Sequence, residues 1–152
     1  MAKNKIDKWF EGKIQDILKE ITAKTPAKFY RYPDMRSTGG GFANKQPGDF
    51  FLLANGKHID IEVKTSEKYS YFREGFKALI KDHQVTASIK THRAGGQYIF
   101  IFYSSKTKMI ELWDGKDIRE PFVTPRMKLT ADPIFTLKPD AHYTEFLQQF
   151  TK

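Results

Sequence analysis

The chain has 152 residues, of which 39% are hydrophobic and 29% are charged. This length and composition predict one soluble globular domain with a real core, and they leave too little chain for two comfortable domains. The formal net charge of +8 favours a polyanionic partner, most often nucleic acid, although a merely basic protein has the same composition. The lack of cysteine excludes disulfides, thiolate metal sites and cysteine nucleophiles, and it fits a reducing cytoplasm.

The first residues predict a helix and not a targeting or membrane segment. They are charged and amphipathic, unlike a signal peptide, and no apolar run in the chain reaches membrane-spanning length. Residues 3–23 carry an apolar stripe at helical spacing, with Trp9 on its flank. The stripe consists of Ile6, Phe10, Ile14, Ile17, Leu18 and Ile21.

A short strand and a long loop follow this helix. Pro26 closes the helix, and residues 28–32 are expected to form the strand. The next stretch, "MRSTGGGFANKQPG" over residues 35–48, is rich in Gly, Ser, Asn and Pro. Loops of this length in compact domains are usually functional or disordered.

Residues 49–54 and 57–65 are predicted to be the two arms of a β-hairpin. Asn55-Gly56 between them is the strongest short-range hairpin signal. A two-residue loop pairs Ala54 with Lys57, and the same register, extended to the far end of the hairpin, pairs Asp49 with Glu62. Two carboxylates would then face each other with Cβ atoms roughly 5 Å apart.

The second half of the chain predicts further helices and strands. Residues 71–96 are interpreted as one helix ending at Ala94-Gly95-Gly96, and residues 97–105 as a central strand buried on both faces. Residues 108–113 form another strand that ends at the Asp114-Gly115 turn. The remaining chain has four prolines (Pro121, Pro125, Pro133 and Pro139) and a short helix over residues 142–150.

The predicted fold class is therefore α/β, a mixed central sheet flanked by helices in the order α-β-β-β-α-β-β. We expect residues 1–120 to form the main domain. Residues 121–152 are expected to be a proline-containing tail that belongs to the same domain.

The paired carboxylates of the hairpin indicate a metal site. Like charges facing each other destabilise a sheet and raise the pKa of one carboxyl, and a divalent cation with oxygen ligands offsets this directly. Lys64 lies on the same face as Glu62, because side chains alternate along a strand. Mg²⁺, or Mn²⁺ in its place, would lower the pKa of a bound water, and Lys64 would orient that water or stabilise the transition state.

The alternative to a metal site is an amphipathic hairpin with a surface salt bridge. Glu-x-Lys alone is a weak signal, since Glu11-Gly12-Lys13 repeats it inside the first predicted helix. The stronger signal is the combination of strand context, hairpin register and an aspartate at the paired position. Asp60 shares the Glu62 face but ranks below Asp49, because the register pairs it with Phe51.

The motif "PGDF…IDIEVK", residues 47–50 and 59–64, resembles the PD-(D/E)XK nuclease motif. The nearest likeness is to Holliday junction resolvases of the RecU and archaeal Hjc type. "RSTGGG" resembles their basic loop, "KDHQVTA" the HQ stretch of the helix after the motif, and "AGGQYIFIFY" the glycine turn and strand that follow. The resemblance covers about residues 5–113.

The resemblance implies a restriction-endonuclease-like core and a Mg²⁺-dependent homodimer that resolves four-way junctions by paired nicks. Asp49, Glu62 and Lys64 match the motif, and Glu11 matches a helical glutamate near the metal. The chain departs from the family where Gly48 replaces other small residues and where residues 31–47 are shorter than the junction-entering stalk of RecU. The sequence alone favours a boundary glutamate on the helix surface for Glu11, and only the resemblance brings a role near the metal level with that interpretation.

Three groups of residues are candidates for contact with DNA. Arg36, Ser37 and Lys45 belong to the glycine-rich loop, which is otherwise just a flexible loop. Lys68, Tyr71 and Arg73 belong to a segment where aromatics alternate with cations, a pattern that suits unstacked bases and phosphates. Gln84 would bond near the metal or to the DNA backbone, and its alternative is a helix-surface glutamine.

The sequence thus predicts a metal-dependent, structure-specific endonuclease that resolves branched DNA in the cytoplasm of a bacterial, archaeal or phage-infected cell. One alternative is a restriction- or repair-type nuclease on linear or flap DNA, because this fold acts on many DNA substrates. The other is a non-catalytic DNA-binding module of the same fold.

Overall fold

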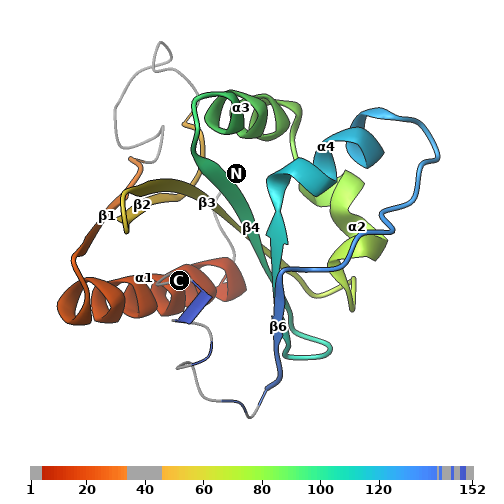
Figure 1. Ribbon diagram of the computed structural model, residues 1–152. Coiled ribbons are helices and arrows are strands. Elements are labelled where there is room, and N and C mark those ends of the chain that lie inside the picture. The colour runs from red at the N-terminus through yellow and green to blue at the C-terminus, as the bar shows by residue number, and fades with distance from the viewer. Residues whose placement is uncertain (1–4, 34–45, 140, 142–144, 146–147, 150–152) are drawn as a thin grey trace.

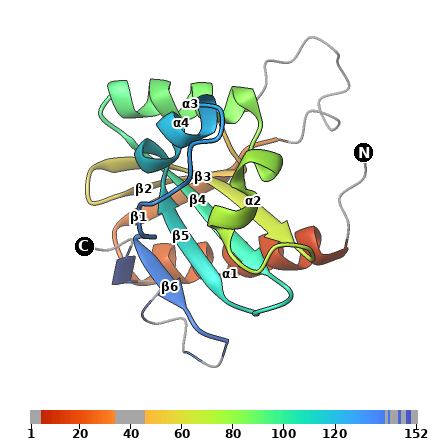
Figure 2. The same cartoon turned by 90° about the vertical axis from the view of Figure 1, so that its right-hand side faces the viewer.

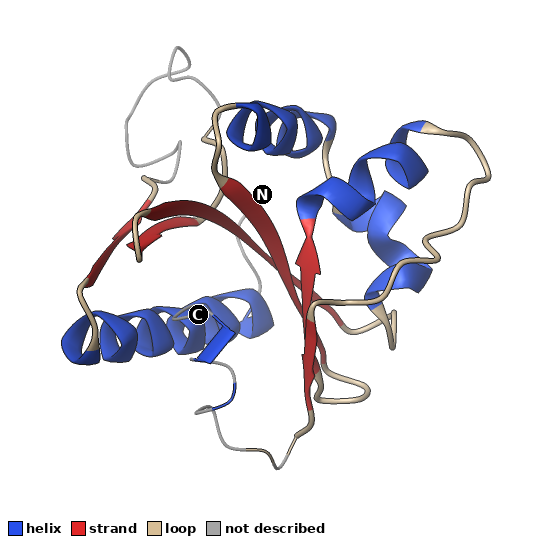
Figure 3. Ribbon diagram, viewed as in Figure 1, coloured by secondary structure: helices blue, strands red, loops and turns tan. Residues whose placement is uncertain are grey.

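The computed structural model describes residues 5–33, 46–139, 141, 145 and 148–149 (Figure 1). The described helices are α1 (Lys5–Lys24), α2 (Phe72–Leu79), α3 (Asp82–Arg93) and α4 (Gly115–Val123). The described strands are β1 (Ala27–Arg31), β2 (Phe50–Ala54), β3 (Lys57–Ser66), β4 (Gln97–Ser104), β5 (Ile110–Asp114) and β6 (Phe135–Leu137). Figure 3 shows these elements by type.

The six strands form one mixed sheet in the order of the chain, β1-β2-β3-β4-β5-β6. Neighbouring strands are antiparallel except β3 and β4, which are parallel and joined by a crossover through α2 and α3. The chain is therefore α/β with a mixed sheet, as the sequence predicted.

Helices cover both faces of the sheet (Figures 1 and 2). α1 packs on one face, where its apolar stripe, including Phe10, Ile14 and Leu18, meets alternate residues of β2 to β5. The opposite face is covered by α2, α3 and α4, whose Phe72 and Ile118 pack with Phe100 and Trp113 of the sheet. Burying a side chain of this size stabilises the fold by about 1.5–3 kcal/mol, so both layers hold the sheet in place.

The predicted hairpin is confirmed over the length of β2. Its register pairs Ala54 with Lys57 and runs to Phe50 opposite Ile61. Asn55 and Gly56 both have positive φ, 52° and 75°, as a type I′ turn requires. The prediction that β4 is central is also confirmed, since its residues 98–104 are buried.

The single helix predicted over residues 71–96 is wrong, because the structure has two helices there. Ile80 and Lys81 are extended, and α3 starts afresh at Asp82. The Gln84 side chain accepts a hydrogen bond from the Lys81 N–H (2.9 Å), which is one half of a capping box. Lysine at the N-cap is not a recognised start signal, so the break had no mark in the sequence.

The tail after Asp114 is more structured than predicted. Asp114 caps α4 by accepting from the Lys116 N–H (3.0 Å), and the helix continues through Pro121 to Val123. Phe135–Leu137 then pairs with β5 as a sixth strand. The predicted α-β-β-β-α-β-β order therefore missed three features: the break between α2 and α3, the helix α4, and the strand β6. The helix expected over residues 142–150 lies mostly outside the described residues.

None of the described helices combines the length and apolar character needed to cross a membrane.

Candidate functional site

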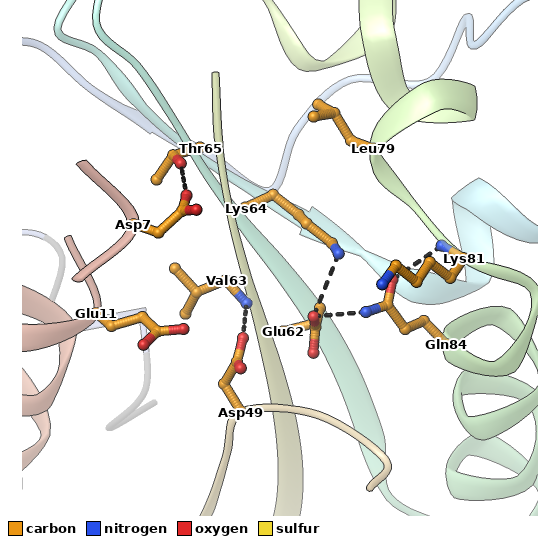
Figure 4. Close-up of a pocket in the computed structure, with 10 residues that line it drawn as sticks. All are labelled: Asp7, Glu11, Asp49, Glu62, Val63, Lys64, Thr65, Leu79, Lys81 and Gln84. Atoms are coloured by element: carbon orange, nitrogen blue, oxygen red, sulfur yellow. Dashed lines mark hydrogen bonds and ion pairs between the residues drawn. The ribbon is translucent and has the colours of Figure 1, made fainter. Parts of the chain in front are cut away.

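A cavity of about 330 Å³ opens at the edge of the sheet where β2 begins (Figure 4). β2 starts at Phe50, whereas β3 continues to Ser66, so residues 62–66 of β3 have no β2 partner. Side chains from both faces of the sheet therefore reach one space. The lining comprises Asp7, Glu11, Asp49, Glu62, Val63, Lys64, Thr65, Leu79, Lys81 and Gln84.

Asp49 lies just before β2 and is held by its backbone and its side chain. Its N–H donates to the Ile61 carbonyl (2.8 Å), and its carbonyl accepts from the Tyr32 N–H (2.9 Å). Its Oδ2 accepts from the Val63 N–H (2.7 Å), so the carboxylate takes the place of a backbone partner on β3. The predicted strand pair of Asp49 with Glu62 is wrong, because the ladder ends at Phe50 and Ile61. Both carboxylates nevertheless line the cavity.

The turn that precedes Asp49 packs tightly on β3 and β4. A Cβ on Gly48 would come within 2.8 Å of the Ile61 carbonyl oxygen, so glycine is needed here. The Tyr98 hydroxyl donates to the Pro47 carbonyl. Burial, with Glu62, Asp49 and Asp60 nearby, raises the pKa of Tyr98, so this hydroxyl keeps its proton and remains a donor.

Glu62 is buried on β3, and its side chain contacts Gln84 and Lys64. Its Oε1 lies 2.6 Å from the Gln84 Nε2 donor and 3.3 Å from the Lys64 Nζ. Gln84 is itself fixed, because its Oε1 accepts from the Lys81 N–H at the start of α3 (2.9 Å). Gln84 is thus not a helix-surface residue: it orients Glu62 toward the cavity, as Figure 4 shows.

Glu11 comes to the cavity from α1, on the other face of the sheet. Only 5% of it is exposed, which contradicts a boundary position on the helix surface. Its Oε2 accepts from Arg31 Nη2 (3.1 Å), which belongs to β1. Asp7, one turn earlier on α1, accepts from the Thr65 hydroxyl at the end of β3 and closes this side of the cavity.

Asp60 is committed to a different network. Its carboxylate accepts from the Tyr32 hydroxyl (2.6 Å) and the Thr91 hydroxyl (2.6 Å), and it contacts His58 Nε2 at 2.8 Å. Burial and the bond to Asp60 raise the pKa of Tyr32, which keeps that hydroxyl protonated. Asp60 therefore ties β1, β3 and α3 together and does not line the cavity.

The structure separates the three groups of predicted DNA contacts. Gln84 lines the cavity, whereas Lys68, Tyr71 and Arg73 do not. Arg73 instead donates to the Ala131 carbonyl (3.3 Å) and lies over the Trp113 ring. The remaining three candidates, Arg36, Ser37 and Lys45, lie outside the described residues.

Lys81 is a cavity residue that the sequence interpretation missed. It lines the main cavity and also an adjoining one of about 270 Å³, which shares Asp49, Glu62 and Gln84 with it. Tyr32 and His83 line the adjoining cavity as well. The interpretation placed Lys81 inside a continuous helix, where it was one more surface lysine. No signal in the sequence marks it, because a recognisable capping box needs Ser or Thr three residues before Gln84, and Lys81 stands there.

The donor set of the cavity suits a hard cation. Asp49 and Glu62 offer carboxylate oxygens, and the Val63 carbonyl points to the same side of β3 as the Val63 N–H that Asp49 binds. Oxygen ligands of this number match Mg²⁺, which usually keeps several waters and takes one or two carboxylates from the protein. Among the described residues, no three His, Cys, Asp or Glu side chains gather closely enough to hold a metal by themselves.

In comparisons with known proteins, no protein-family model matches the chain, and no curated protein matches it either.

Proposed function

We propose that this chain is a metal-dependent endonuclease with a PD-(D/E)XK-type core that cuts branched DNA. The observation that carries the proposal is the set of side chains at one cavity. Glu11 from α1, Asp49 before β2, and Glu62 and Lys64 from β3 all line it. Asp49, Glu62 and Lys64 match the sequence motif, and Glu11 is the helical glutamate that the resemblance added. The four residues come from three separate segments of the chain.

Asp49 and Glu62 are the residues that would hold Mg²⁺ or Mn²⁺. The bound metal would polarise a phosphate oxygen and lower the pKa of a water molecule. Lys64, beside Glu62, carries the positive charge that would stabilise the developing negative charge on the phosphate. Glu11 approaches from the opposite face and would bind the metal or its water shell.

The substrate part of the proposal rests on charge and on resemblance. A net charge of +8 suits a polyanion, and Lys81 adds a cation to the lining of both cavities. The likeness to RecU and Hjc resolvases extends the proposal to four-way junctions. It also extends it to a homodimer, since paired nicks require two active sites, and to a cytoplasmic place of action.

A cleavage assay tests this proposal. The protein is incubated with a labelled four-way junction, the matching linear duplex and a flap, in Mg²⁺ and in EDTA. We expect paired nicks in the junction that disappear in EDTA and in Glu62→Gln, but persist in Glu67→Gln, an exposed glutamate after β3. Equal cutting of the linear duplex would support a nuclease but exclude a junction-specific resolvase.

A second candidate is a DNA-binding module without catalysis. It is favoured by two ion pairs, Arg31 with Glu11 (3.1 Å) and Lys64 with Glu62 (3.3 Å), which neutralise the carboxylates without a metal. Such a module would bind junctions equally well in Mg²⁺ and in EDTA and leave them uncut. Tight binding without any cutting would therefore decide for this candidate.

A further inference from the structure

Three aromatic rings stack across the first three strands of the sheet. The ring centroids of Tyr30 on β1 and Phe51 on β2 are 5.4 Å apart, with an interplanar angle of 14°. Phe51 in turn stacks on His58 of β3 at 4.8 Å and 10°. Stacking between residues of three different strands produces a rigid row of nearly parallel rings.

This aromatic row, formed by Tyr30, Phe51 and His58, is accessible to solvent. Tyr30 is 57% exposed on the edge strand, and the His58 side chain is 43% exposed. The row lies on the α3 side of the sheet, but α3 packs on β3 and β4, where Thr91 reaches Asp60. No described helix covers β1 and β2 on this side, as Figure 1 shows.

The aromatic row adjoins the candidate active site. His58 and Glu62 lie on the same face of β3, and Asp60 between them holds both His58 and the Tyr32 hydroxyl. The Tyr32 ring lies 6.2 Å from Phe51 and also lines the cavity that Asp49 and Glu62 share. A DNA strand whose phosphate is bound at the carboxylates would therefore pass the aromatic row where it leaves the cavity.

We propose that the aromatic row receives an unpaired nucleobase of the DNA strand whose phosphate lies at the carboxylates. This inference rests on the proposed function and names its substrate more closely: DNA with an unstacked base beside the cleavage site. Every base has a π-face, so an exposed ring stack binds bases of any sequence. Lys28, exposed on the same face of β1 as Tyr30, supplies a cation for the phosphate backbone.

The experiment measures stacking and binding in EDTA, so that cutting plays no part. 2-Aminopurine is placed at the unpaired position of a branched or gapped DNA, and a fully paired duplex of the same sequence is the reference. Wild type and Tyr30→Phe should quench the fluorescence, whereas Tyr30→Leu should not, because leucine keeps apolar area and loses the π-face. We expect the affinity of Tyr30→Leu for the unpaired DNA to fall about 5- to 100-fold, with under a twofold change on the duplex.

Three results would overturn this inference. One is an equal loss of affinity for paired and unpaired DNA, which would mean that Tyr30 contacts the sugar-phosphate backbone of the DNA and not a base. Another is unchanged quenching in Tyr30→Leu. The third is a change from dimer to monomer by sedimentation with DNA affinity unaltered, which would make this face an interface between two copies of the chain.

Two controls keep these results distinct from other failures. Tyr30→Thr, which keeps a high strand propensity, serves as the second variant if Tyr30→Leu does not fold. Cleavage by the wild type in Mg²⁺ is measured in parallel. Stacking without cleavage would refute the proposed nuclease, and cleavage without stacking would refute only the role of the aromatic row.

Discussion

Two buried glutamates on the same face of the sheet show how differently a carboxylate can be used. Glu62 on β3 and Glu111 on β5 are exposed to 7% and 5%, so burial does not distinguish them. Glu111 accepts from two neutral donors, the Phe72 N–H and the Trp113 Nε1–H, both at about 3 Å. Glu62 contacts a lysine and an amide and lines a cavity.

The comparison teaches that the partners of a buried carboxylate indicate its role better than its burial does. Glu111 holds the first turn of α2 against β5, and burial raises its pKa above the ordinary value of 4.5. Glu62 lines the cavity and is held from one side by Gln84. Under the proposed function, Glu111 has a structural role and Glu62 a catalytic one, and the following predictions test that division.

The largest effect is expected from exchanging the two glutamates for glutamine. Glu62→Gln should lower the cleavage rate at least about 10²-fold with little change in stability, because several kcal/mol of transition-state stabilisation depend on the metal. Glu111→Gln should leave the rate within a few-fold but lower the free energy of unfolding by about 1–3 kcal/mol, since one donor loses its acceptor. Cleavage kinetics and urea unfolding of both variants measure this. The opposite pattern would reverse the assignment.

The second effect concerns the residue that orients Glu62. Gln84→Leu should lower the cleavage rate about 10- to 100-fold and raise the Mg²⁺ concentration needed for half-maximal rate, because groups that orient metal ligands contribute on this scale. Thr86→Ala, on the exposed side of the same helix, is the matched control and should do neither. A loss of rate with an unchanged Mg²⁺ requirement would mean that Gln84 does not act through the metal ligand.

The third effect concerns the approach of Asp49 to β3. Gly48→Ala places a Cβ within 2.8 Å of the Ile61 carbonyl oxygen, so the turn must shift and move Asp49. We expect about a tenfold loss of rate and a destabilisation of about 1–3 kcal/mol. Gly12→Ala is the matched control, since a Cβ there meets nothing within 4 Å and alanine favours a helix by about 0.5–1 kcal/mol. Both are read by cleavage and by thermal melting. A fully active Gly48→Ala would show that the turn does not position Asp49.

The smallest effect is the pH dependence contributed by Glu111. A carboxyl whose folded pKa lies above its unfolded pKa stabilises the fold fully below the unfolded value, and this contribution is lost as pH rises through the folded value. The free energy of unfolding of wild type minus that of Glu111→Gln should therefore fall as pH rises from 4 through the raised pKa. Denaturation between pH 4 and pH 8 measures it, and other titrating groups cancel in the difference. A difference that stays constant with pH would mean that burial does not raise the pKa of Glu111.

The local parts of the fold and of the site were predictable from sequence. The Asn55-Gly56 turn and the alternation that follows it specify the register of β2 with β3, because turn geometry and side-chain period act over a few residues. The same alternation places Glu62 and Lys64 on one face. The stripe of α1 identified its buried side, and the apolar run of β4 identified a central strand.

The tertiary structure decided everything that depends on segments far apart in the chain. Glu11 became a cavity residue only because α1 packs under β3, and the break before α3 places Gln84 on Glu62. Lys81 lines the cavity for the same reason, and β6 forms only because β5 offers it an edge. Because β2 begins only at Phe50, the last residues of β3 have no β2 partner, and the sheet is open where the carboxylates lie. None of these contacts leaves a local pattern, since each is the result of packing between elements that are separated in sequence.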